Sequence, residues 1–237
     1  AVAEALGVEA DGGTSEVIRR ARRLDAAPLA IYGAALGGRV IAEYLELVGR
    51  WRAVAYLDDA DDLPEEIDGI PVRPGSDLGG LLEEGIAHVF VAIGLGRVRL
   101  AVMDRVEEAG LTLPTLVHPA AYVAPSAALG RGALVKAGAT VGTSVRVGPG
   151  SIIDNGAVVP HDNTIGAGAL IAPGAALGSG IVVGDRAVVG IGARVATAVH
   201  IGADAVVATG AAVVRDVAPG DVVEGAPARV VGRVRLP

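Results

Sequence analysis

Aliphatic residues recur at every sixth position through the second half of the chain. The series starts at Val117 and ends at Val213, and its 17 hexads follow one another without an insertion. A small or β-branched residue stands four places after each aliphatic residue, and Asn163 is the only amide in that column. Because a period of six matches neither an α-helix nor a plain alternating strand, each hexad is predicted to form a short extended segment followed by a corner. Stacking of such units would bury the aliphatic column in a narrow interior.

Glycine often follows the aliphatic residue directly, as at Gly142, Gly148 and Gly166. We expect these glycines to form the corners, because glycine tolerates positive φ. The composition agrees with a narrow interior, since the chain has 35 glycines and aromatic residues make up only 3% of it.

Residues 28–116 show a different pattern, in which strands and helices alternate. The run "PLAIYGAALGGRVIAEYLEL" predicts a strand, a glycine-rich turn and an amphipathic helix, and "WRAVAYLDDADD" and "HVFVAIGLG" predict two more strands. This alternation favours a small parallel α/β domain. We therefore divide the chain into an N-terminal helical extension or linker at 1–27, the α/β domain at 28–116, the repeat domain at 117–218 and a C-terminal tail at 219–237.

Charge and residue types argue against several classes of protein. The 27 acidic and 20 basic residues give a net charge of −7, and nucleic-acid binding needs clustered positive charge instead. The sequence has no run of 18 apolar residues, so no membrane span is predicted. It has no cysteine, which excludes disulfides and a thiol nucleophile, and its four histidines lack a metal-ligand spacing. With no visible signal peptide, we expect a cytoplasmic protein.

A glycine-rich turn follows the first strand of the α/β domain. Gly33, Gly37 and Gly38 stand there at the start of a helix, where free N–H groups and the helix dipole favour a phosphate. Asp58 and Asp59 end the next strand about 20 residues later, where a carboxylate could bind a ribose hydroxyl. The spacing is not GxGxxG, so an NAD-dependent oxidoreductase is a weak interpretation. A plain strand-to-helix connection is the alternative.

His161 interrupts the apolar repeat. It lies two places after Val159, in a column of polar residues and prolines, so its side chain is predicted to point away from the interior. An imidazole can accept a proton near neutral pH, and the adjacent Asp162 can orient it as a general base. Because no recognisable motif places a serine beside the histidine, direct attack by a substrate amine or hydroxyl on an activated acyl group is the simpler route. An ordinary surface histidine is the alternative.

The runs "VHPAAYVAPSAALG", "IIDNGAVVPHDNTIGAGALIAPGAAL" and "GAPARVVG" resemble the sialic acid O-acetyltransferase and nucleotide-amino-sugar N-acetyltransferase family of hexapeptide-repeat acyltransferases. The resemblance extends over nearly all of residues 28–232. It implies a Rossmann-like parallel-sheet domain that binds a nucleotide sugar, followed by a left-handed parallel β-helix with three hexads per coil. It also implies acetyl-CoA as the donor, bound in the groove between neighbouring β-helices of a homotrimer.

The same resemblance assigns roles to individual residues. His161 would be the general base, Asp162 would orient it, and the backbone N–H of Ser179 would polarise the thioester carbonyl. Further acetyl-CoA contacts are implied at Asn155, Gly180, Ala226, Pro227 and Arg229, and nucleotide-sugar contacts at Gly33, Ala34, Gly37, Gly38, Asp58, Asp59 and Gly94.

We therefore expect acetyl-CoA-dependent acetylation of the amino group of a nucleotide-linked amino sugar, of the UDP-4-amino-sugar type. Within the enzyme class, the alternative is O-acetylation of a sugar such as sialic acid. The sequence departs from the family pattern at Leu36, Leu95 and Leu170. These changes leave open a protein of another class, a non-catalytic trimeric binding or scaffold protein.

Overall fold

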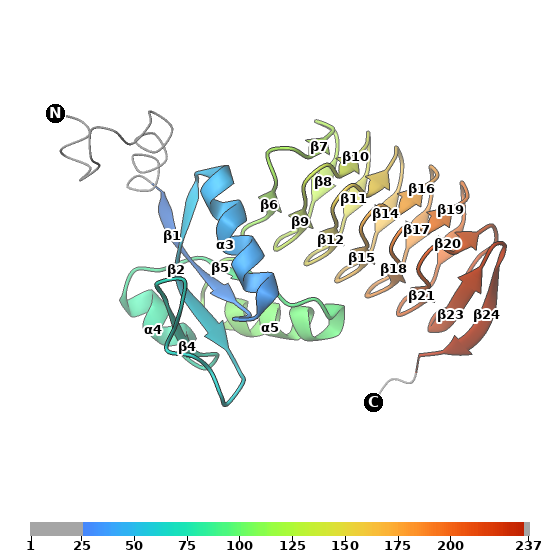
Figure 1. Ribbon diagram of the computed structural model, residues 1–237. Coiled ribbons are helices and arrows are strands. Elements are labelled where there is room, and N and C mark those ends of the chain that lie inside the picture. The colour runs from blue at the N-terminus through green and yellow to red at the C-terminus, as the bar shows by residue number, and fades with distance from the viewer. Residues whose placement is uncertain (1–25, 235–237) are drawn as a thin grey trace. The chain divides into compact units, whose positions relative to one another are not determined.

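The computed structural model describes residues 26–234, which form two compact units (Figure 1). The described part of the first unit comprises residues 26–93 and 106–112, and that of the second comprises 94–105 and 113–234. All but the last two residues of the predicted N-terminal extension, 1–27, lie outside the described part of the chain.

The first unit contains a five-stranded sheet with the strand order β3-β4-β2-β1-β5. All neighbouring strands are parallel except β3 and β4, which confirms the predicted parallel α/β arrangement. Apolar residues of the central strands, such as Leu29, Ile31 and Leu57, are fully buried in its core. The elements are β1 (Ala27–Tyr32), α3 (Leu36–Val48), β2 (Trp51–Asp58), β3 (Glu66–Ile67), β4 (Ile70–Pro74), α4 (Leu78–Glu83) and β5 (Val89–Val91).

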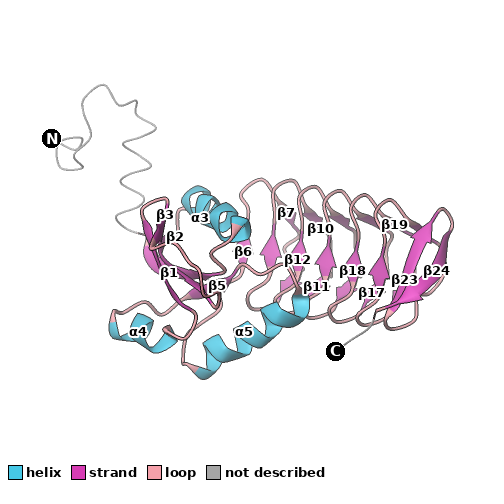
Figure 2. Ribbon diagram, turned by 60° about the horizontal axis from the view of Figure 1, so that its bottom comes forward, coloured by secondary structure: helices cyan, strands magenta, loops and turns pink. Residues whose placement is uncertain are grey.

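The second unit contains a parallel β-helix that begins with the 17 two-residue strands β6 to β22. Each of these strands ends on a residue of the aliphatic series, so the hexad register is confirmed. Successive strands join three different sheets in turn, and residues 18 apart therefore stack, as Val141 does on Val159 (Figure 2). The strands are β6 (Leu116–Val117), β7 (Tyr122–Val123), β8 (Ala128–Leu129), β9 (Leu134–Val135), β10 (Thr140–Val141), β11 (Arg146–Val147), β12 (Ile152–Ile153), β13 (Val158–Val159), β14 (Thr164–Ile165), β15 (Leu170–Ile171), β16 (Ala176–Leu177), β17 (Val182–Val183), β18 (Val188–Val189), β19 (Arg194–Val195), β20 (His200–Ile201), β21 (Val206–Val207) and β22 (Ala212–Val213).

The glycines that follow the aliphatic residues have a different role from the predicted one. At most corners the positive φ falls two places later, as at Gly150 and Gly168, so the prediction for Gly148 and its equivalents was wrong. A Cβ atom at Gly148 would lie 2.7 Å from the backbone nitrogen of Ala167 on the next coil. Glycine is therefore needed at this position because two backbones approach closely, and not because of its φ angle.

The C-terminal residues extend one sheet of the β-helix. Strand β23 (Asp221–Gly225) pairs in parallel with β21, and β24 (Ala228–Arg233) returns antiparallel to β23. Part of the segment that we predicted as a tail is thus a hairpin that covers the open end of this sheet.

Helix α5 (Gly96–Glu108) provides the most deeply buried charged side chain of the described residues. The guanidinium of Arg99 donates hydrogen bonds to the carbonyls of Gly94, Gly150 and Gly168 at 2.7, 2.5 and 2.8 Å. Burial lowers the pKa of Arg99 to about 10, so the group still carries its charge at neutral pH. Arg99 therefore ties this end of α5 to the corners of two stacked coils.

Candidate active site

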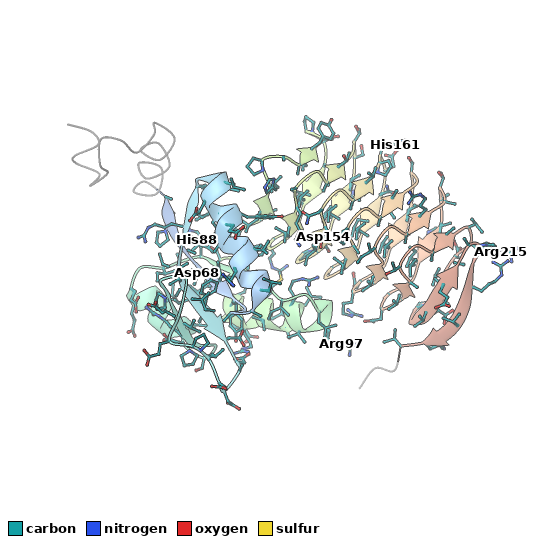
Figure 3. The ribbon with its side chains drawn as sticks, viewed as in Figure 1. Asp68, His88, Arg97, Asp154, His161 and Arg215 are labelled. Carbon is teal, nitrogen blue, oxygen red and sulfur yellow. The ribbon has the colours of Figure 1, made fainter. Side chains whose placement is uncertain are left out.

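Three polar residues gather at two stacked corners of the β-helix. His161 and Asp162 lie between β13 and β14, and Ser179 lies at the equivalent corner after β16. Strands β13 and β16 are parallel neighbours, which puts the two corners about 4.8 Å apart. His161 stands on the outer edge of the β-helix, as predicted, with 61% of its side chain exposed (Figure 3).

The imidazole of His161 has a polar partner at each of its nitrogens. Nδ1 lies 2.8 Å from Oδ2 of Asp162, and Nε2 lies 2.9 Å from Oγ of Ser179. A ring protonated on Nδ1 satisfies both contacts, because it donates to the carboxylate and accepts from the hydroxyl. The structure thus places a serine beside the histidine, which the sequence motifs did not predict. The 18-residue offset between His161 and Ser179 was the signal, since both stand two places after an aliphatic residue.

The backbone fixes where the carboxylate of Asp162 lies. Asp162 has a φ of 59°, in the left-handed region that aspartate tolerates better than most residues do. Its backbone N–H donates to the carbonyl of Thr143, at the corner of the coil before, at 3.0 Å. The coil-to-coil ladder therefore holds the acid beside the histidine.

Asn163 closes both of these corners from inside the β-helix. Most corners are closed by a backbone bond across the turn, such as that from Ala157 N–H, but this bond is absent from the two corners described here. Instead, the fully buried amide of Asn163 donates to the carbonyls of Pro160 and Gly178 at 3.0 and 2.9 Å, and it accepts from Ile181 N–H at 2.6 Å. The only amide in the small-residue column therefore ties the histidine corner to the serine corner.

The backbone N–H of Ser179 donates to no backbone carbonyl within the described residues, and the same is true of the equivalent residues Thr143 and His161. An unpaired N–H on the outer surface, next to the Ser179 side chain, is available to an oxygen of a ligand. The following residue, Gly180, donates its N–H to the carbonyl of His161 at 3.4 Å.

The other predicted acetyl-CoA contacts lie away from His161. Asn155 stands at a different corner of the same coil, after β12. Ala226 and Pro227 form the β23–β24 loop, and exposed Arg229 follows on β24. Four strand-to-strand steps separate β12 from β23 in their sheet, or about 19 Å. Only an elongated ligand could contact both this loop and His161.

The predicted nucleotide residues in the first unit come together around the turn before α3. A Cβ atom at Gly38 would lie 2.0 Å from the carbonyl oxygen of Gly33, so this turn requires glycine. The Asp58 carboxylate accepts hydrogen bonds from the N–H groups of Ala34 and Ala60 at 2.7 and 3.1 Å. Asp58 therefore holds the turn in shape, a role that we did not predict.

Asp59, the start of α3 and Gly94 were also predicted to bind the nucleotide sugar, and their surroundings differ. Asp59 accepts a hydrogen bond from the hydroxyl of Tyr32 at 2.8 Å, and both Asp58 and Asp59 line a cavity of about 490 Å³. The start of α3 carries no side-chain cap and no acidic residue in its first turn. The N–H of Gly38 donates to the carbonyl of Ala35 at 2.9 Å, whereas the N–H groups of Leu36 and Gly37 have no backbone acceptor within the described residues and are open to an anion. Gly94 belongs to the second unit, where its carbonyl accepts from Arg99.

Two negative findings apply to the described residues alone. None of their helices is long and apolar enough to cross a membrane. They also contain no group of three or more His, Cys, Asp or Glu side chains that could hold a metal ion.

Comparisons with known proteins agree with this architecture. A family model described as the PglD N-terminal domain matches residues 28–106. PerB from Caulobacter crescentus, in complex with CoA and GDP-perosamine, is 37% identical, with a TM-score of 0.82 over 87% of this chain and 98% of that one. The acetyltransferase domain of PglB from Neisseria gonorrhoeae, in complex with acetyl coenzyme A, is 31% identical, with a TM-score of 0.80 over 87% of this chain and 100% of that one.

WeeI from Acinetobacter baumannii shares the fold, with a TM-score of 0.78 at 23% identity over 87% of this chain and 100% of that one. A comparison with curated protein sequences gives no match. The fold is that of the left-handed β-helix acyltransferases that carry a parallel-sheet N-terminal domain. The chain belongs to the sugar N-acetyltransferases of the hexapeptide-repeat family, and it is an enzyme of that family.

Proposed function

We propose that the protein transfers the acetyl group of acetyl-CoA to the amine of a nucleotide-linked amino sugar. The observation that carries this proposal is the exposed imidazole of His161, which has Asp162 at one nitrogen and a hydroxyl at the other. The similar structures that contain acetyl-CoA, or CoA with GDP-perosamine, support the choice of donor and acceptor.

His161 acts as the general base in this proposal. As the amine nitrogen attacks the acetyl carbonyl carbon, Nε2 accepts the proton that the amine loses, and Asp162 stabilises the imidazolium that forms. The backbone N–H of Ser179 donates to the carbonyl oxygen as negative charge develops on it.

We assign the two ligands to separate groups of residues. The nucleotide phosphates lie at the open N-terminus of α3, beside the turn that Gly33 and Gly38 shape. The acetyl-CoA molecule extends from His161 toward the β23–β24 loop and Arg229, whose guanidinium can pair with a phosphate. Asp58 contributes to the nucleotide site through the shape of the turn, because its carboxylate already binds Ala34 N–H.

The working enzyme is proposed to be a homotrimer that completes this site between protomers. His161 and Asp162 are 61% and 65% exposed in the single chain, and Val158 and Val182 beside them are also exposed. A neighbouring β-helix would cover these apolar residues and exclude water from the imidazole. Light scattering at several protein concentrations measures the assembly, and a persistent monomer with full turnover would contradict it.

A substrate panel tests the reaction itself. Release of CoA from acetyl-CoA is followed with UDP- and GDP-linked 4-amino sugars and with free sialic acid. His161→Gln is expected to lower kcat/KM by a factor of roughly 10² to 10⁴. Thr143→Ala, an exposed change in the same column one coil earlier, is the matched control. Reaction with free sugars alone would move the assignment to O-acetylation, and an unchanged His161→Gln enzyme would remove the assigned base.

A further inference from the structure

Arg215 stands in the same row of corners as His161. The row consists of the corners that follow β7, β10, β13, β16, β19 and β22, which are successive strands of one sheet. His161 lies two places after the last residue of β13, and Arg215 lies two places after the last residue of β22. Three strand-to-strand steps separate these two strands, or about 14 Å. Figure 3 shows both side chains on the outside of the β-helix, with Arg215 nearer its C-terminal end.

The guanidinium of Arg215 is exposed, and it has no hydrogen bond or ion pair with the residues that the structure describes. The neighbouring acid, Asp216, is engaged elsewhere. Its carboxylate accepts a hydrogen bond from the backbone N–H of His200 at 2.8 Å and lies 3.9 Å from Nδ1 of the same residue. This corner is short, since the next aliphatic residue, Val217, comes four places after the last one instead of six and bridges to Ile201. Asp216 thus closes the short corner, and the charge of Arg215 is left to a ligand.

The two corners between His161 and Arg215 carry no long side chain. Residues 178–180 and 196–198 form them, and each of these residues is Gly, Ala, Ser or Thr. No side chain there blocks a ligand that runs along the row from His161 to Arg215. In the opposite direction from His161, toward β7, the row holds only a threonine and a proline. A ligand with a negative charge therefore finds a cationic partner in this row only on the side of β22.

The length of the pantetheine arm of acetyl-CoA matches the separation of His161 and Arg215. About 13 single or amide bonds join the thioester sulfur to the first phosphorus, and an extended chain spans about 3.5 Å for every three such bonds, so the arm is about 15 Å long. Three steps of the β-helix cover about 14 Å. When the thioester lies at His161, the diphosphate of an extended donor therefore falls beside Arg215.

We infer that Arg215 binds the diphosphate of acetyl-CoA and sets the direction in which the donor lies along the β-helix. This inference rests on the proposed function, which places the thioester at His161. The planar guanidinium can donate two parallel hydrogen bonds to phosphate oxygens. CoA carries a third phosphate on its ribose, which leaves a separate partner for Arg229.

Calorimetric titration of the full chain with CoA tests the inference without any sugar. Arg215→Ala should weaken CoA binding by a factor of roughly 10 to 100, because a hydrogen-bonded pair of opposite charges is lost. Arg215→Lys should recover part of the affinity, since lysine keeps the charge but not the paired donors. Arg194→Ala is the matched control, because Arg194 is an exposed arginine on β19, on the face of the same sheet and outside the row of corners. An equal loss in the control, or no loss in Arg215→Ala, would overturn the inference.

A truncated ligand shows which phosphate Arg215 contacts. 3′-Dephospho-CoA retains the diphosphate and lacks the ribose phosphate. The loss of affinity caused by Arg215→Ala should be the same for CoA and for 3′-dephospho-CoA, whereas the loss caused by Arg229→Ala should disappear with the truncated ligand. A loss in Arg215→Ala that disappears with 3′-dephospho-CoA would assign Arg215 to the ribose phosphate and overturn the inference.

Kinetics separate this inference from the proposed function. With the reactive amino sugar, Arg215→Ala should raise KM for acetyl-CoA and leave kcat near the wild-type value. With S-acetylpantetheine, which has no phosphate, wild type and variant should react alike, and a loss that persists with this donor would contradict the inference. If Arg215→Ala binds CoA as tightly as wild type while the sugar is still acetylated, the inference fails and the proposed function stands. If no sugar consumes acetyl-CoA but CoA binding depends on Arg215 as described, the phosphate contact stands and the proposed function fails.

Discussion

Replacing Asn163 by alanine tests how the β-helix holds its two functional corners. Alanine is the commonest residue in this column, so the change introduces no steric conflict. It removes three hydrogen bonds, two donated to the carbonyls of Pro160 and Gly178 and one accepted from Ile181 N–H. Because these groups lie at the corners that carry His161 and Ser179, both stability and turnover should fall.

The expected loss of folding stability follows from the number of hydrogen bonds that the Asn163 side chain makes. A hydrogen bond contributes about 1 kcal/mol net, so Asn163→Ala is expected to cost about 3 kcal/mol. Backbone bonds of the kind seen at the other corners can form in the variant, and they would reduce this figure. Ser151→Ala is the matched control, because Ser151 is the other fully buried polar residue of the column and makes one bond, to the carbonyl of Gly166. It should cost about 1 kcal/mol.

Urea unfolding followed by circular dichroism measures both losses at one fixed protein concentration. The difference in unfolding free energy is the shift in midpoint multiplied by the slope of the transition. Asn163→Ala should shift the midpoint about three times as far as Ser151→Ala does. Equal shifts would refute the assignment of Asn163 as the group that closes both corners, and so would a stable Asn163→Ala protein whose kcat is unchanged.

Three further expectations concern packing and charge. Gly148→Ala should lower the urea midpoint of unfolding more than Gly156→Ala does, because a Cβ atom at Gly148 would lie 2.7 Å from the next coil. A Cβ atom at Gly156 would face open space, and only the positive φ of that position would cost alanine about 1–2 kcal/mol. Equal midpoints would contradict this expectation. Burial lowers the pKa of the His88 imidazole in the folded protein below its unfolded pKa, which is near ~6.5. The contribution of the neutral ring to folding stability is therefore complete above the unfolded pKa, and it is lost as pH falls through the folded pKa. The Tm of His88→Gln should therefore fall less than that of wild type from about pH 7 to about pH 5, and parallel curves would disprove the effect. The side-chain hydrogen bond from Arg186 lowers the pKa of the Asp204 carboxyl in the folded protein. The ion pair therefore stabilises the fold above about pH 4, and this stabilisation is lost as pH falls through the folded pKa of Asp204. Urea midpoints at about pH 6 and pH 3 should show a smaller acid loss for Arg186→Ala than for wild type, and an equal loss would count against the pair.

The repeat could be predicted from the sequence because it is a local pattern copied many times. Each strand of the coils ends on the predicted residue, such as Val141 or Val159, since a uniform period of six leaves no other register for the aliphatic column. The outward direction of His161 followed from the same lattice. The role of glycine did not, because the distance from Gly148 to the next coil depends on how two coils stack, and the pattern within one hexad does not contain that distance.

In the first unit, too, some features could be predicted from the sequence and others could not. Alternating strands and helices predicted its parallel sheet, and the glycine turn was correctly placed before a helix. The contact between Asp58 and Ala34 N–H was not predicted, because it joins the ends of two neighbouring strands that are 24 residues apart in the chain. The burial of Arg99 against Gly150 and Gly168 likewise depends on which coils α5 packs against.

By itself, the sequence determined the β-helix, its register and the pair of His161 and Asp162, because hydrophobic period and adjacency along the chain are enough for these. Only the tertiary structure decided that Ser179 lies against Nε2 and that Asn163 holds both corners from inside. The physical reason is that a parallel ladder brings residues one full coil apart to within about 4.8 Å. Side chains that meet across this distance are chosen by the stacking of coils, and no local motif in the chain records which of them form hydrogen bonds.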